Sequence, residues 1–85
     1  MGERIIIIED DQGVRFFLEE ALKGEGYRVN SFESYEDAYR SIRNDTDLVI
    51  MDISLPGLDG LSATTAIKAK YDVPVLVITA YGTKK

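Results

Sequence analysis

Three unbroken apolar runs place the strongest constraint on how this chain can fold. Residues 5–8, 48–51 and 75–78 each consist of four consecutive apolar residues, rich in β-branched side chains. Runs without alternation are typical of strands covered on both faces, as in parallel sheets. A fourth run, residues 27–30, alternates apolar and polar residues, which is typical of a half-exposed edge strand. We therefore expect a buried sheet with the second strand outermost.

Helical patterns separate these runs. Apolar residues recur at intervals of three and four at Val14, Phe17, Leu18, Ala21 and Leu22. This stripe predicts a core-facing helix that ends at Gly24 or Gly26. A second stripe follows a predicted Ser34 N-cap, at Tyr35, Ala38, Tyr39 and Ile42. A third helix, of weaker propensity because Thr64 and Thr65 are β-branched, is expected to begin near Leu61, and Pro74 opens the last strand.

The order of these elements predicts the fold class. Strands that alternate with helices form a parallel sheet, because each helix is a right-handed crossover between strands that run in the same direction. We expect an α/β, doubly wound sheet in a single domain over residues 1–85. No helix pattern follows residues 75–78, so we expect the domain to be incomplete, with its fourth strand uncovered.

Composition excludes several classes of function. Ten basic and 15 acidic residues give a net charge of -5, which disfavours direct contact with nucleic acid. The chain contains no cysteine and no histidine, which excludes disulfides, Cys/His zinc sites and histidine-based triads. It has no apolar stretch long enough to span a membrane and no signal peptide, so we expect a cytoplasmic location.

Acidic residues follow two of the predicted strands. Glu9, Asp10 and Asp11 come after the first strand, Asp52 after the third, and Thr79 after the fourth. Sites in open α/β sheets lie beyond the carboxyl ends of the strands. If the first and third strands are neighbours, about 4.8 Å apart, their carboxylates converge. Such a cluster needs a cation, and oxygen ligands alone select Mg²⁺, with Mn²⁺ as an alternative.

A magnesium site of this kind suits phosphoryl chemistry. Asp52 is the candidate nucleophile, and the Thr79 hydroxyl and Mg²⁺ would hold the phosphoryl oxygens, giving an aspartyl phosphate. Each residue alone also has a structural explanation: Asp52 as a turn former or helix cap, Asp11 as a helix cap, and Thr79 as a partner for strand-end backbone groups. Their coincidence at one sheet edge favours a functional site.

Three segments together resemble the receiver domain of two-component response regulators. They are residues 5–11 (IIIIEDD), 47–60 (DLVIMDISLPGLDG) and 75–82 (VLVITAYG), in the order and spacing of that family. The resemblance implies a flavodoxin-like sheet with strand order 2-1-3-4. It also implies that the last helix-strand-helix part of the domain is missing from these 85 residues.

The resemblance implies specific roles for site residues. Asp52 would be the phosphoacceptor, and Glu9 and Asp10 the acidic pair that holds Mg²⁺, with Asp10 as a direct ligand. Ser54 would contribute its backbone carbonyl to the metal, and Thr79 would be the hydroxyl that switches on phosphorylation. A histidine kinase or phosphotransfer protein would be the donor, and the chain would be a signalling domain, not an enzyme beyond self-phosphorylation and self-dephosphorylation.

Further implications concern the switch and the pathway. Ala80 would be the small residue that leaves room beside the switch hydroxyl. The family's fifth-strand lysine is not present, so we expect impaired switching in this chain. Residues 79–82 (TAYG) are similar to those of receivers in transcription control or phosphorelays.

Other functions remain open from the residues alone. The uncovered fourth strand would suit a self-assembling interaction module, a homo-oligomer without phosphotransfer. A hydrolase of the haloacid-dehalogenase type would need an Asp-x-Asp pair after the first strand, which Glu9-Asp10-Asp11 does not supply as nucleophile and general acid. A dinucleotide or flavin site would need a glycine-rich turn, whereas only Gly13 lies there.

Overall fold

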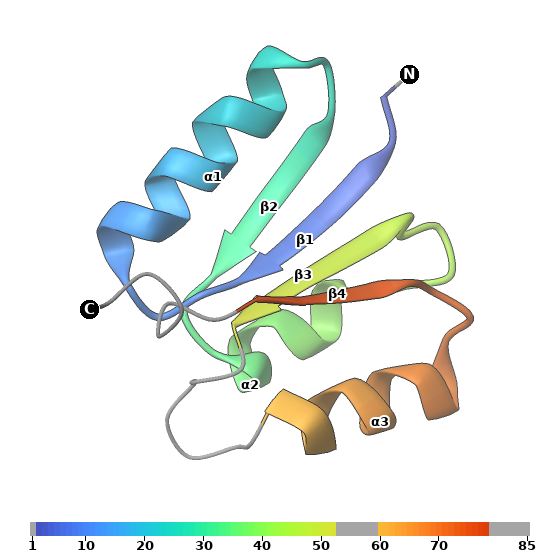
Figure 1. Cartoon of the computed structure of the whole chain (residues 1–85). Coiled ribbons are helices and arrows are strands. Elements are labelled where there is room, and N and C mark those ends of the chain that lie inside the picture. The colour runs from blue at the N-terminus through green and yellow to red at the C-terminus, as the bar shows by residue number, and fades with distance from the viewer. Residues whose placement is uncertain (1, 53–59, 79–85) are drawn as a thin grey trace.

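The computed structural model describes residues 2–52 and 60–78. Its elements in chain order are β1 (Arg4–Ile8), α1 (Gln12–Gly24), β2 (Arg28–Phe32), α2 (Tyr35–Ala38), the 3-10 helix η1 (Tyr39–Ser41), β3 (Leu48–Asp52), α3 (Gly60–Lys70) and β4 (Val75–Ile78). The four strands are parallel and lie in the order β2-β1-β3-β4 (Figure 1). The predicted doubly wound α/β fold and the edge position of the second strand are confirmed.

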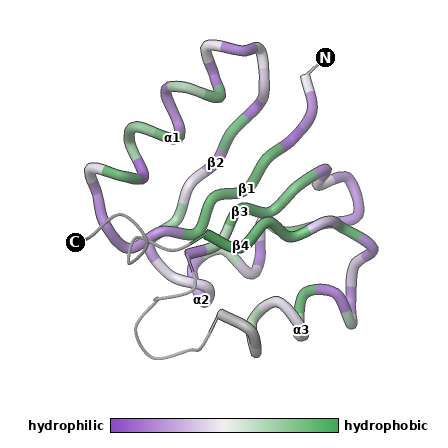
Figure 2. Tube along the Cα trace, viewed as in Figure 1, coloured by the Kyte–Doolittle hydropathy of each residue, from purple (hydrophilic) through white to green (hydrophobic). Residues whose placement is uncertain are grey.

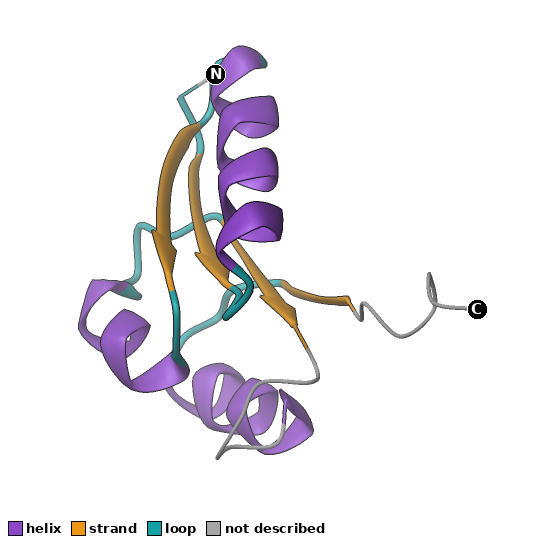
Figure 3. Ribbon diagram, turned by 90° about the vertical axis from the view of Figure 1, so that its left-hand side faces the viewer, coloured by secondary structure: helices purple, strands orange, loops and turns teal. Residues whose placement is uncertain are grey.

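Helices cover both faces of the sheet. Helix α1 lies on one face, and α2 and α3 lie on the other (Figure 3). The hydropathy of the trace is highest along β1, β3 and β4, between these layers (Figure 2). Alternate residues of β1 divide between two cores: Ile6 and Ile8 face α2 and α3, whereas Ile5 and Ile7 face α1. Within the described residues, no helix is both long enough and apolar enough to cross a membrane.

The predicted stripe of α1 is only partly buried. Leu18 and Leu22 pack against the core that contains Ile5 and Ile7, as predicted. Val14 and Phe17 do not: their exposed fractions are 36% and 69%. The prediction that the whole stripe faces the core is therefore wrong for this flank of the helix.

The position of α1 over the sheet explains this exposure. The helix packs on β1 and β2. On the flank of α1 nearest β2, the Glu19 carboxylate accepts a hydrogen bond of 2.9 Å from the Ser31 hydroxyl of that strand. The opposite flank, which carries Phe17, is therefore directed toward the β3–β4 half of this face. Leu76 of β4 is 51% exposed. Among the described elements, none covers this half of the face.

The end of α1 explains why β2 begins one residue later than expected. The amide of Gly26, which has a φ of +96°, donates to the carbonyl of Lys23, and the amide of Tyr27 donates to Leu22. Because these bonds close the helix C-terminus through Tyr27, the strand starts only at Arg28.

The second predicted helix is shorter than its stripe. Ser34 is the N-cap, as predicted, and its hydroxyl accepts a hydrogen bond from the Asp37 amide. Only Tyr35–Ala38 is α-helical, and the chain then tightens into η1, which ends before Ile42. Ala38 and Ile42 are nevertheless both buried in the core that contains Ile6 and Ile8, although the α-helix changes to a 3-10 helix between them.

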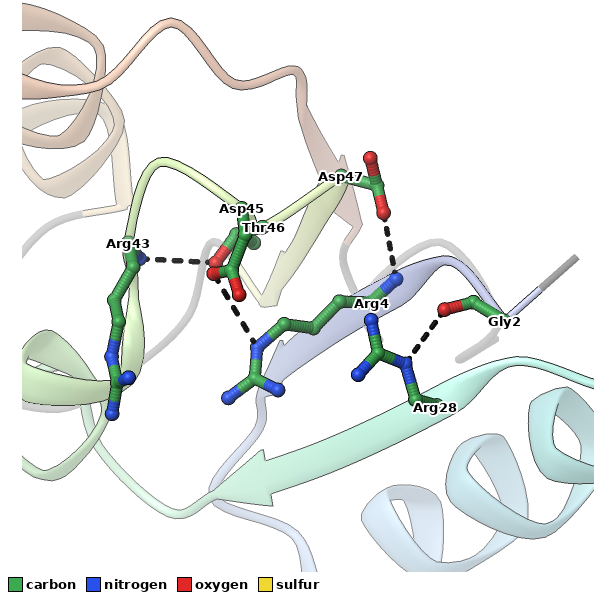
Figure 4. A network of polar contacts seen from close by, with 7 residues as sticks. All are labelled: Gly2, Arg4, Arg28, Arg43, Asp45, Thr46 and Asp47. Atoms are coloured by element: carbon green, nitrogen blue, oxygen red, sulfur yellow. Dashed lines mark hydrogen bonds and ion pairs between the residues drawn. The ribbon is translucent and has the colours of Figure 1, made fainter.

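A polar network ties the strands together at their amino ends (Figure 4). The backbone amide of Arg4 donates to the carboxylate of Asp47, and the Asp47 amide returns a bond to the Arg4 carbonyl. The Arg4 guanidinium lies 3.9 Å from the Asp45 carboxylate, and the Arg28 guanidinium donates to the carbonyl of Gly2. The amino edge of the sheet therefore carries both arginines and aspartates, which bond to one another and to the backbone.

Candidate metal and phosphoryl site

The register of β1 and β3 brings Glu9 and Asp52 together. Ile8 lies opposite Met51, so the next residues along these parallel strands are Glu9 and Asp52. Both side chains are 2% exposed. One carboxylate oxygen from each of Glu9, Asp10 and Asp52 lies within 4.8 Å of the others. The predicted convergence of these three acids at the carboxyl edge is present.

The acidic residues in the turn between β1 and α1 have different roles. The Asp11 carboxylate accepts a hydrogen bond of 3.0 Å from the Val14 amide and caps α1, which is the structural role considered for it above. The Asp11 amide in turn donates to the Glu9 carboxylate at 3.0 Å. The side chain of Asp10 is exposed. Asp11 therefore shapes the turn, while Glu9 and Asp10 face the cluster with Asp52.

Burial and charge repulsion change the protonation of the cluster. The pKa of Glu9 is raised to about 7, chiefly by desolvation. The charge of Asp52, a side-chain hydrogen bond with Asp52 and the charge of Asp10 contribute to this rise, and the hydrogen bond from the Asp11 amide opposes it. The metal-free cluster consequently holds a proton near neutral pH. A cation among these oxygens would replace that proton and relieve the repulsion.

The donor set fits a magnesium ion. All three candidate ligands are carboxylates, the hard oxygen donors that Mg²⁺ prefers. Ligand oxygens of an octahedral Mg²⁺ lie about 3 Å apart when adjacent and about 4 Å apart when opposite. The oxygens of Glu9, Asp10 and Asp52 lie within 4.8 Å of one another, so small movements suffice to bind one ion.

Three further residues were predicted for the site. Ser54, Thr79 and Ala80 lie outside the described residues. Another residue, Arg15 of α1, was missed by the sequence analysis: its guanidinium donates a hydrogen bond of 2.7 Å to the backbone carbonyl of Glu9. The sequence did contain a signal for Arg15. A positive charge near a helix N-terminus interacts unfavourably with the helix dipole, so an arginine at this position indicates another, favourable interaction.

Comparisons with known proteins agree with this geometry. Residues 5–85 match the response regulator receiver domain family. An uncharacterized transcriptional regulatory protein of Bacillus subtilis, YrkP, is 36% identical over 80 residues, which cover 94% of this chain and 35% of that protein. The chain thus spans about a third of the length of this curated relative.

Solved structures show the same fold. The response regulator TrrA of Thermotoga maritima, in complex with Mg²⁺ and BeF, has a TM-score of 0.81 and 36% identity, over 95% of this chain and 72% of that chain. TrrA in complex with the histidine kinase ThkA gives a TM-score of 0.84 and 36% identity, over 93% of this chain and 70% of that chain. More than a quarter of each TrrA chain has no counterpart in these 85 residues. The chain belongs to the response regulator receiver domain family of two-component signalling.

Proposed function

We propose that this chain accepts a phosphoryl group on Asp52, with Mg²⁺ held by Glu9, Asp10 and Asp52. The observation that carries the proposal is the approach of one oxygen from each of these acids to within 4.8 Å of the others. The complex of TrrA with Mg²⁺ and BeF supports it, because that receiver relative holds the metal. In the proposed arrangement Ser54 adds a backbone carbonyl to the metal, Thr79 holds a phosphoryl oxygen and Ala80 leaves room for it.

The residues of the site would have different roles in the transfer of the phosphoryl group. An oxygen of Asp52 forms a bond to phosphorus while the bond to the donor's imidazole nitrogen breaks, and the electron pair stays on that nitrogen. A Mg²⁺ ion held by Glu9, Asp10 and Asp52 would neutralise negative charge on the phosphoryl oxygens. Glu9 and Asp10 would orient the metal side of the site around the acceptor Asp52. The burial of Asp52 at the end of β3 limits the access of water to its carboxylate.

The proposed donor is the phosphohistidine of a histidine kinase or phosphotransfer protein. The chain contains no histidine, so it cannot supply the donor itself. A relative, TrrA, is bound to the histidine kinase ThkA, which supports this class of partner. The similarity to YrkP, named as a transcriptional regulatory protein, supports a role in the control of transcription for a longer protein with this receiver.

Phosphorylation of a single carboxylate tests the proposal. Acetyl phosphate with Mg²⁺ is expected to add one phosphoryl group to the wild-type chain, detected by intact mass, and none to Asp52→Asn. Asp72→Asn, which removes an exposed carboxylate in the loop before β4, is the matched control and should be labelled like wild type. Equal labelling of Asp52→Asn and wild type would overturn the assignment.

We further propose that phosphorylation changes the conformation of this 85-residue chain only weakly. The family resemblance assigns part of the switch to a fifth-strand lysine, which these residues do not include. The beryllofluoride complex should therefore shift the amide NMR signals of residues around Asp52 but few signals of β2 and α3. Large shifts across both elements would contradict this view.

Self-assembly is the second candidate function, favoured by the exposure of β4. This strand lies at the end of the sheet order, and Leu76 is 51% exposed. We propose that two copies pair through this edge. Sedimentation should then show a dimer for wild type and a monomer for Leu76→Lys, with Phe16→Lys on the outer side of α1 remaining dimeric. A wild-type monomer at high concentration would refute pairing.

A further inference from the structure

Arg15 is bonded to the backbone that carries the acidic pair. Its guanidinium donates a hydrogen bond of 2.7 Å to the carbonyl of Glu9. Glu9 follows the last residue of β1, and its amide donates to the Phe32 carbonyl of β2. The peptide of Glu9 is therefore held on one side by the neighbouring strand and on the other by α1.

This bond acts where the backbone leaves the sheet. A buried carbonyl at the end of a strand needs a donor, and a charged guanidinium is a strong one. Glu9 is 2% exposed, so water has little access to its peptide. Together with the Asp11 amide bonded to the Glu9 carboxylate, the Arg15 bond fixes both the main chain and the side chain of Glu9.

Glu19 on the next turn of α1 carries a negative charge that interacts with Arg15. The Glu19 carboxylate accepts one hydrogen bond from the Ser31 hydroxyl of β2 and lies 3.1 Å from the ammonium of Lys23. Bonding to Lys23, with smaller contributions from Ser31 and from the charge of Arg15, lowers the pKa of Glu19. Glu19 is thus an anion whose charge interacts with that of Arg15, while its carboxylate is bonded to Ser31 of β2.

We propose that Arg15 is a positioning residue, which sets the Glu9-Asp10 turn in the geometry that binds Mg²⁺. The inference rests on the proposed metal site, but Arg15 itself touches neither the metal nor the phosphoryl group. Groups that orient metal ligands in this way typically change metal affinity by about 10- to 100-fold when they are removed.

The test compares Arg15→Met with wild type in two measurements. Arg15→Met keeps the long apolar stem and the helix propensity but removes the donor. Titration calorimetry should show Mg²⁺ binding weakened by about ten-fold. Without metal, the exchange rates of the Asp11 and Val14 amides should rise, while that of Leu22, later in α1, stays unchanged. Arg40→Met, with the same loss of charge on exposed η1, should match wild type in both measurements.

Arg15→Lys separates the hydrogen bond from general effects, because lysine keeps one charged donor. It should lose less Mg²⁺ affinity than Arg15→Met. Equal losses in the two variants, an unchanged affinity in Arg15→Met, or faster exchange along the whole of α1 would each overturn the proposal. If the wild-type chain bound no Mg²⁺, the proposed function would fail, and the metal-free exchange of Asp11 and Val14 would still decide whether Arg15 orders the turn.

Discussion

Glu9 is the residue at which the chemistry of the cluster is most visible. Its carboxyl group is 2% exposed and faces Asp52 and Asp10, and its pKa is raised to about 7, chiefly by desolvation. Near neutral pH a proton and a Mg²⁺ ion therefore compete for the same oxygens. We expect Mg²⁺ affinity to increase as pH rises toward 8.

The same shift predicts how stability depends on pH. An acid whose pKa is raised in the folded state stabilises that state at low pH, and this contribution is lost as pH rises through the folded value. Between the unfolded value of 4.5 and about 7, the metal-free chain should lose up to about 3 kcal/mol of unfolding free energy. Urea unfolding in EDTA at pH 5, 6, 7 and 8 measures this loss.

Glu9→Gln is the control for this prediction. The amide keeps the size of the side chain and carries no titrating proton, so the slope of stability between pH 5 and 8 should largely disappear. The chain has no histidine to titrate in this range, so a remaining slope cannot come from one. Equal slopes in Glu9→Gln and wild type would show that the Glu9 carboxyl is not the source.

At the residue scale, the acidic site residues could be predicted from the sequence, whereas Arg15, which bonds to the backbone beside them, could not. The rule that sites lie at the carboxyl ends of strands identified Glu9, Asp10 and Asp52, because that rule depends only on strand order. It did not identify Arg15, because a bond from a helix side chain to a strand-end carbonyl depends on how α1 lies over the sheet. The roles of these residues remain predictions.

At the scale of elements, α1 shows how a sequence pattern and burial can differ. Its apolar stripe is wider than the surface that the described sheet and helices offer it. Leu22 packs on the sheet, whereas Phe17 on the same stripe is 69% exposed. Helical periodicity indicates which residues share a face, but burial also requires a partner for that face.

The two flanks of α1 should respond differently to mutation. Leu22→Ala removes apolar contacts with the core and should cost about 1–2 kcal/mol, less than for a fully buried leucine. Phe17→Ser should change the unfolding free energy by less than about 0.5 kcal/mol, because the ring makes few contacts to lose. Chemical denaturation of both variants measures the difference. A larger cost for Phe17→Ser than for Leu22→Ala would show that the Phe17 flank is covered in solution.

The strands were more predictable than the helix boundaries. Unbroken apolar runs specify β1, β3 and β4 to within one residue. For β1 and β3 the reason is burial on both faces, which favours apolar residues at every position. The division of the second helical stripe into α2 and η1 could not be predicted, because Ala38 in α2 and Ile42 directly after η1 lie in the same core, as they would in one continuous helix. The parallel direction of the strands followed from the alternation of strands and helices, whereas the strand order 2-1-3-4 came from the family resemblance.

At the scale of the molecule, the sheet has two chemically different edges. Its amino edge carries Arg4 and Arg28 with Asp45 and Asp47, and these opposite charges partly neutralise one another. Its carboxyl edge gathers Glu9 and the other two candidate ligands, whose carboxylate oxygens lie within 4.8 Å of one another. Both edges contain acids, so a cation attracted by negative charge alone could bind at either edge.

The most direct test of the account is the location of a bound paramagnetic ion. Mn²⁺, added in small amounts to the isotope-labelled chain, broadens the NMR signals of nuclei close to its site. Broadening should centre on residues 9–11 and 52, should spare Asp45 and Asp47, and should be reversed by excess Mg²⁺. Broadening centred on the Asp45 and Asp47 edge, or spread evenly over the acidic surface, would contradict the claim that Glu9, Asp10 and Asp52 form one metal site.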